Sequence, residues 1–238
     1  MTFPTVVGTP VTSSSTSDAT PITVNLQTTN VEAGNIMVVC ISVTTAGDPA
    51  PTLTTPDGWS LVATQSLPAT ISTPRAYVFA RKIPTAGLGS TVDIDASATL
   101  GFAAVAFVLR GTDETPNIVG TWGTGTAIDA PCPTPTATRE NCIIIHFLAT
   151  DAQVITADDP ADTLIGNIGI ATPGNGTEIW VSYQNQSLPG AAAAATFDNT
   201  SDQYAVNTIA WSLSLFPMWN NFQFPKSGNG ISVTEKIK

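Results

Sequence analysis

Apolar residues recur along the chain in short runs that are either continuous or alternate with polar residues. Both patterns are typical of β-strands, which are buried on two faces in the first case and on one face in the second. We find no apolar stripe with the helical period of about 3.6 residues. The predicted strands cover residues 4–11, 21–28, 35–44, 60–66, 75–83, 90–97, 102–110, 141–150, 163–170, 177–186, 191–198 and 204–216.

Clusters of proline, glycine and aspartate separate these runs, as in GDPAP (47–51), PCPTP (131–135) and TPGNG (172–176). Such clusters favour turns and break helices. The alanine run at 191–195 is too short for a stable helix and has no N-cap, so we expect a strand of small side chains. Many short strands at this spacing predict a β-sandwich or barrel.

The chain contains an internal repeat that indicates how the strands are arranged. GNIMVVCISVTT (34–45) resembles ENCIIIHFLATD (140–151) at an offset of 106, and residues 76–110 align with 179–213 at an offset of 103. Each half is a four-strand unit that cannot bury its apolar face alone, so stacking the halves would close a core. Duplication and convergence on a β-pattern both explain the few identities.

We therefore predict an all-β fold, an antiparallel β-sandwich of jelly-roll type with two similar halves and an extended C-terminal arm. The sandwich covers residues 1–216, with half one at about 20–113 and half two at about 138–216. The arm covers residues 217–238.

Composition limits the partners. Charged residues make up only 11 % of the 238 residues, against roughly 25 % in an ordinary globular domain. The net charge is −10 and no basic cluster is present, so we expect no direct nucleic-acid contact. A neutral, polar surface suits a protein packed among others at high local concentration.

We expect a protein made in the cytoplasm, without membrane association. The N-terminus has no signal-peptide pattern, and the longest apolar stretch, 101–111, is about half of the roughly 20 residues that a membrane helix requires. Three cysteines are an odd number, which predicts reduced thiols, with Cys40 and Cys142 as small buried hydrophobic residues.

Four motifs carry a resemblance to a known family. They are AGN at 33–35, PDGW at 56–59, RK at 81–82 and RGTD at 110–113, each at the start or end of a predicted strand. In this order they resemble a group of tailed-phage structural proteins of jelly-roll type. The resemblance spans roughly residues 5–215. It implies a virion component such as a decoration, fibre or tail-associated protein, and it implies no catalytic residues.

The candidate chemistry is sparse. His146 is the only histidine and lies in a predicted strand, so a structural role is the plainer interpretation. It is the only neutral-pH base available to a serine or cysteine nucleophile, and no G-x-S-x-G motif exists. Cys132, Cys142 and His146 give only three widely spaced zinc ligands. We predict no enzyme activity, no cofactor and no metal.

Carboxylates form two groups. Asp93 and Asp95 alternate on one face of a predicted strand, which we interpret as a solvated face. The densest acidic cluster comprises Asp158, Asp159 and Asp162, for which we expect a solvated loop, with calcium binding as the alternative. Trp122, in the loop GTWGTG, could stack on a sugar or anchor its own loop. Together these loops would make a host-glycan site.

The C-terminal arm is unusually aromatic. Exposed aromatic residues at this density would be an aggregation liability, so we expect the arm to dock on another subunit or on the shell beneath, with folding back onto its own sandwich as the alternative. The interface residues predicted in and next to the arm are Phe216, Met218, Trp219, Phe222 and Phe224.

These features predict a non-enzymatic structural component of a bacteriophage virion. Among virion roles we favour a capsid-surface decoration or head-fibre protein. Its partners would be the major capsid protein, a neighbouring structural protein, or copies of itself, with trimers common in such assemblies. The alternative is a tail- or baseplate-associated carbohydrate-binding module that recognises the host. An esterase or glycosidase is a third, weaker hypothesis.

Overall fold

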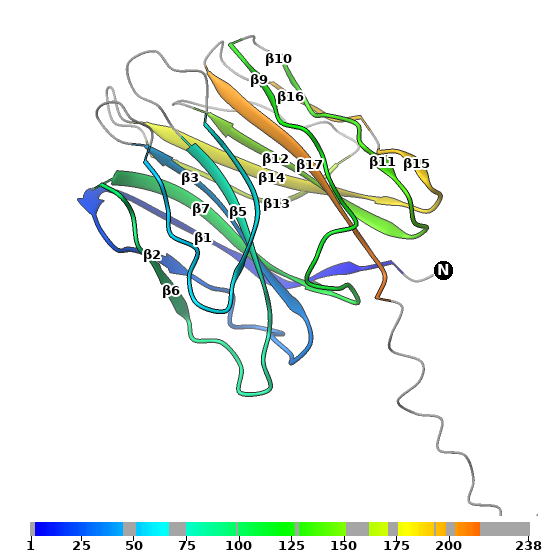
Figure 1. The fold of residues 1–238 in the computed structure, drawn as a ribbon, viewed down its shortest axis with the longest axis horizontal. Helices are drawn as coiled ribbons and strands as arrows, with labels where there is room; N and C mark the ends of the chain where they lie inside the picture. The colour runs from blue at the N-terminus through cyan, green and yellow to red at the C-terminus, as the bar shows by residue number, and fades with distance from the viewer. Residues whose placement is uncertain are drawn as a thin grey trace, which may run out of the picture.

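The computed structural model describes residues 3–44, 51–66, 75–98, 100–126, 129–150, 162–170, 176–192, 194–198 and 203–214. Two antiparallel sheets stack face to face, and two-stranded ribbons cover their outer faces (Figure 1). Strands are the only regular elements among the described residues. The predicted all-β antiparallel sandwich is confirmed.

The first sheet is built from the first half of the chain. A ribbon of two short strands, β2 (Ile22–Asn25) and β6 (Thr91–Ile94), covers its outer face. The order of strands across the sheet is β1 (Thr5–Ala19), β7 (Leu100–Arg110), β3 (Ile36–Thr44), β5 (Arg75–Lys82) and β4 (Ser60–Ser66).

The second sheet is built from the second half. Its strands follow in the order β13 (Thr163–Ile170), β14 (Thr177–Gln186), β12 (Cys142–Thr150), β17 (Tyr204–Ser212) and β8 (Ile118–Val119), with β9 (Gly123–Gly125) also paired to β17. Two outer ribbons pair β10 (Asp129–Pro131) with β16 (Thr196–Asp198) and β11 (Thr136–Ala137) with β15 (Gly190–Ala191).

The central strands are buried on both faces, which explains their continuous apolar sequence. In β3, Val38 and Cys40 face the second sheet, while Val39 and Ile41 face the β2–β6 ribbon. Burial of each such side chain contributes roughly 1.5–3 kcal/mol. Apolar packing on both faces therefore fixes each sheet between its neighbouring layers.

The two sheets have the same internal plan. The order β7-β3-β5-β4 in the first matches β17-β12-β14-β13 in the second. A register shift interrupts β4 between Leu61 and Ala63, and another interrupts β13 between Leu164 and Gly166, 103 positions later. The strands of each half stay in one sheet, so the interleaved connectivity of a jelly roll is not confirmed.

The β-bulges also show which residues correspond. Ala63 pairs with Val78, and Gly166 pairs with Val181, so these valines are equivalent. Val78 pairs with Cys40 and Val181 with Phe147, which makes β3 and β12 equivalent at an offset of 107 rather than the predicted 106. Because side chains alternate between faces, this one-residue difference reverses the face assigned to every residue of the strand.

The two ends of the sandwich differ. At one end, called the arm end, Leu213 bridges to Thr112 and the Ser214 N–H donates to the Gly111 carbonyl oxygen at 2.9 Å. At the other, called the loop end, the hydroxyls of Ser42 and Thr177 share a hydrogen bond of 2.5 Å between the sheets. β1 begins and β17 ends on the same side of the molecule (Figure 1). The predicted arm, 217–238, lies outside the described residues.

Candidate functional site

The only histidine is placed in the middle of β12. Its neighbours Ile145 and Phe147 face the first sheet, so alternation turns His146 to the outer face of the second sheet. The His146 side chain has no exposed surface. The structural interpretation of this residue agrees with its burial.

Asp162 is the partner of His146. The residue directly precedes β13, and its Oδ2 atom lies 2.6 Å from Nδ1 of His146. The hydroxyl of Ser182, on β14, donates to the same Oδ2 at 2.8 Å. The side chain of Asp162 is fully buried. The expectation of a solvated acidic loop is therefore wrong for Asp162, while Asp158 and Asp159 lie outside the described residues.

Competing effects set the pKa of Asp162. Burial alone would raise it, because a buried carboxylate loses its hydration. The hydrogen bond and the charge of His146, together with the hydrogen bond from Ser182, outweigh burial and hold the pKa below its usual range. The Gln184 amide also lies close enough to lower the pKa, although its Nε2 atom makes no hydrogen bond of normal geometry to the described residues. The site thus favours the carboxylate form.

The pair belongs to a row of polar residues that we call the polar strip, comprising His146, Asp162, Ser182, Gln184 and Thr208. His146 lies directly between Ser182 on β14 and Thr208 on β17. Within the described part of the chain, Nε2 of His146 and Oγ1 of Thr208 are buried without a hydrogen-bond partner. Apolar clusters on the same face, packed under the two ribbons, flank the strip.

The described residues of the first half form no such strip. Three residues of the strip, His146, Ser182 and Thr208, lie side by side on neighbouring strands. Their equivalents in the first half carry apolar side chains, which pack beneath the β2–β6 ribbon. The polar strip is therefore a property of the second half and not a requirement of the fold. The three apolar positions are Val39, Phe79 and Ala106.

The strip contains the groups of a hydrolase without their arrangement. In a catalytic triad the hydroxyl bonds to the imidazole, which in turn bonds to the carboxylate. Here the hydroxyl of Ser182 bonds to Asp162 instead. The two side chains of the pair are also fully buried. What the arrangement does is tie the start of β13 to β12 across β14.

Trp122 lies on the opposite face of the second sheet. Its ring packs edge-on against Phe147, with centroids 5.7 Å apart and planes at 76°. Phe147 faces the space between the sheets, whereas His146 and its partner Asp162 lie on the outer face of the second sheet. The structure therefore does not bring Trp122 and Asp162 together into one ligand loop, and Trp122 packs against the core between the sheets.

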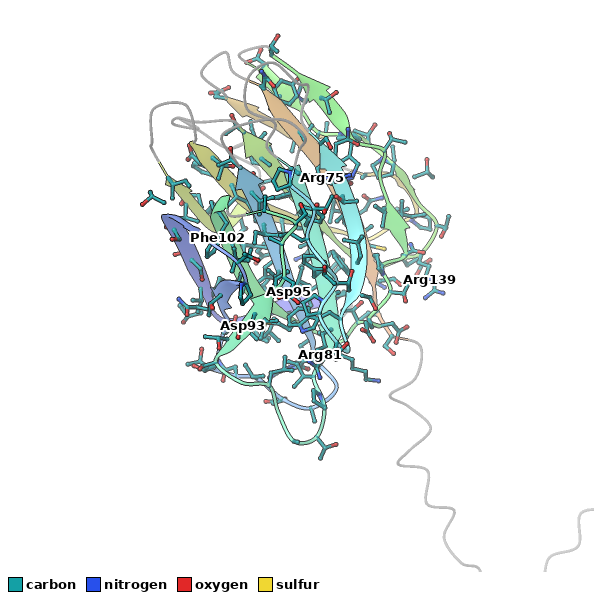
Figure 2. All side chains as sticks on the ribbon, turned by 60° about the vertical axis from the view of Figure 1, so that its left-hand side comes forward. Arg75, Arg81, Asp93, Asp95, Phe102 and Arg139 are labelled. Carbon is teal, nitrogen blue, oxygen red and sulfur yellow. The ribbon has the colours of Figure 1, made fainter. Side chains whose placement is uncertain are left out.

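The other candidates occupy separate places. Asp93 and Asp95 are exposed at the β2–β6 ribbon, and Asp93 accepts a hydrogen bond of 2.7 Å from Thr23 (Figure 2). All three cysteines are free, and Cys40 and Cys142 are buried, as predicted; Cys132 is buried as well. Burial raises the pKa of the Cys40 thiol. Among the described residues no group of three or more histidine, cysteine, aspartate or glutamate side chains could hold a metal ion.

The arm end carries a second candidate surface. One hollow is lined by Arg139, Glu140, Asn141, Ser212 and Leu213, and another by residues 185–191. Figure 2 shows Arg139 and Arg81 well away from Arg75 at the start of β5. The arm follows directly from this surface, but its predicted interface residues Phe216, Met218, Trp219, Phe222 and Phe224 lie outside the described residues.

Comparisons with protein-family models, with curated proteins and with solved structures find no match. A search of the described residues for a helix that is long and apolar enough to span a membrane finds none.

Proposed function

We propose that the protein is a non-enzymatic structural component of a bacteriophage particle, a capsid-surface decoration or head-fibre protein that attaches through its C-terminal arm. The supporting sequence observations are the resemblance to phage structural proteins, the low content of charged residues and the aromatic arm. The partner would be the major capsid protein, a neighbouring structural protein or further copies of the chain.

One structural observation carries this proposal, namely where the chain leaves the sandwich. β17 ends at Ser212, and Ser214 is hydrogen-bonded to Gly111 at the arm end. The strand ends at Thr44 and Thr150 lie at the opposite, loop end. An arm that starts at one end can hold the molecule to a surface while the other end projects outward.

Burial of the only histidine supports a role without catalysis. His146 has its Nδ1 atom engaged by Asp162 and has no exposed surface, so it is not placed to accept a proton from a bound substrate. The stacked layers favour the same role. Close-packed sheets give a rigid body, which a repeated surface component requires.

The experiment compares the full chain with a chain that ends at Ser214. Both are purified and shown to be folded by circular dichroism. Each is then mixed with particles of the same phage that were assembled without this protein. Sedimentation should recover the full chain with the particles and leave the shortened chain in the supernatant, and antibody labelling in negative stain should place it on the head. Equal recovery of the two chains, or recovery of neither, would contradict the proposal.

A further inference from the structure

Two neighbouring hollows at the arm end make up the surface that we call the arm-end groove. The first is lined by residues 139–141 and 212–213, of which Leu213 is the apolar member. The second is lined by residues 185–191, the turn between β14 and β15. The Asn141 N–H donates to the Ser187 carbonyl oxygen at 3.2 Å, so the two hollows share a boundary.

The groove presents an apolar side chain on a fixed turn. Leu188 is 64 % exposed, the highest value among the exposed large hydrophobic residues that the structure describes. Its turn is held from within, because Nε2 of Gln186 donates to the carbonyl oxygens of Leu188 at 2.9 Å and of Gly190 at 3.3 Å. A leucine displayed in this way offers apolar area that a partner segment would bury.

The C-terminal arm starts at the rim of this groove. Leu213 lines the first hollow, and Ser214 is the last described residue. The aromatic segment, residues 216–224, begins two positions later. An extended chain advances by about 3.3–3.6 Å per residue, so the segment begins within about 7 Å of Ser214.

We propose that, in the free protein, the arm-end groove binds the chain's own aromatic segment, residues 216–224. A short tether supplies an effective concentration of about millimolar, which favours the chain's own segment over that of a second copy in dilute solution. The seated segment covers its aromatic side chains until assembly releases them. This inference extends the proposed function, and it can fail separately.

Paired cysteines test the proposal. Leu188→Cys is combined in turn with Cys at positions 216, 218, 219, 222 and 224, and each double variant is oxidised mildly at low protein concentration. Matched controls place the first cysteine at Leu164, which is 49 % exposed on β13. The three native cysteines are buried and are present in every variant, so they affect both series equally. At least one Leu188 pair should form an intramolecular disulfide about ten times faster than its Leu164 control, because a disulfide needs Cα atoms within about 7 Å.

Three results would overturn the proposal: disulfides that link two chains in the Leu188 variants, equal rates in the Leu188 and Leu164 series, or no disulfide in any pair. The particle-binding experiment is independent of these results. Loss of particle binding on truncation, together with no preferred disulfide, would support the proposed function and contradict binding of the aromatic segment in the groove. A rapid intramolecular disulfide in a chain that never binds particles would support binding in the groove and contradict the proposed function.

Discussion

Asp162 reaches His146 across the intervening strand β14, with 2.6 Å between Oδ2 and Nδ1. Removing one member of a buried pair leaves the other without compensation, which typically costs about 3–5 kcal/mol. We therefore expect Asp162→Ala to lower the free energy of unfolding by about that amount, measured by urea denaturation followed by circular dichroism.

Asp95→Ala is the matched control for this variant. Asp95 is exposed next to β6, and substitution of such a residue usually changes stability by less than about 0.5 kcal/mol. Equal effects of the two substitutions would show that the Asp162 pair does not hold the second sheet together.

The same pair predicts how stability depends on pH. The pKa of Asp162 in the folded protein lies below its ordinary value of 3.8, so the unfolded chain binds the proton more readily. The stabilisation by this carboxylate is fully present above the ordinary pKa and is lost as the pH falls through the folded pKa. The difference in unfolding free energy between the wild type and Asp162→Asn should therefore shrink as the pH is lowered from about 5 to about 2. A difference that stays constant or grows over this range would contradict the assignment.

A second prediction concerns the unpartnered hydroxyl of Thr208. This side chain is fully buried, its Oγ1 atom has no hydrogen-bond partner among the described residues, and the first half carries Ala106 at the equivalent place. Thr208→Val should raise the free energy of unfolding by about 1 kcal/mol, because it removes a desolvated hydroxyl and keeps the shape.

Thr177→Val is the control for this change. Thr177 is equally buried, but its hydroxyl bonds to Ser42 and donates to the Thr150 carbonyl oxygen at 3.2 Å. Its replacement should therefore destabilise by about 1–3 kcal/mol. The prediction for Thr208 fails if both variants lose stability by similar amounts in the same denaturation assay.

The strands could be predicted from the sequence, but the register of the repeat could not. Residues 60–66, 163–170 and 177–186 are strands with the predicted bounds. β3 and β12 are buried at every position, so their sequence does not alternate and nothing in it distinguishes the two faces. That is why the predicted alignment of these strands is one residue out and exchanges their faces.

The polar strip could not be predicted from the sequence, for a related reason. Asp162 lies beside other acidic residues in the sequence, which suggested a solvated loop, and its partner is 16 residues away on another strand. The short strands β8 to β11, between residues 118 and 137, were also missed, because Pro- and Gly-rich sequence indicates turns. The predicted strand at 191–198 is divided between β15, which pairs with β11, and β16, which pairs with β10.

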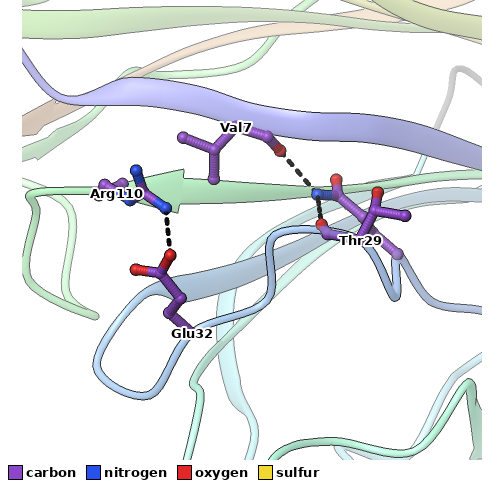
Figure 3. Close-up of polar contacts among 5 residues, drawn as sticks. Val7, Thr29, Glu32 and Arg110 are labelled. Atoms are coloured by element: carbon purple, nitrogen blue, oxygen red, sulfur yellow. Dashed lines mark hydrogen bonds and ion pairs between the residues drawn. The ribbon is translucent and has the colours of Figure 1, made fainter.

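The last prediction concerns Gly8, where β1 leaves its regular pairing with β7. Gly8 has a φ of 73°, and a side chain there would overlap both the Gln27 amide and the Thr29 carbonyl oxygen. Figure 3 shows why neither can yield: Nε2 of Gln27 donates to the carbonyl oxygens of Val7 at 2.6 Å and of Thr29 at 2.7 Å. Gly8→Ala should lower the free energy of unfolding by about 2–4 kcal/mol, the sum of backbone strain and overpacking.

Gly34→Ala separates these two contributions. Gly34 also has a positive φ, 89°, but a Cβ atom there would meet nothing within 4 Å. Only the cost of the left-handed backbone remains, roughly 1–2 kcal/mol. Urea denaturation of both variants should therefore show the larger loss for Gly8→Ala. If the two losses are equal, the Gln27 amide is free to move aside, and the clamp on β1 is weaker than its two short hydrogen bonds indicate.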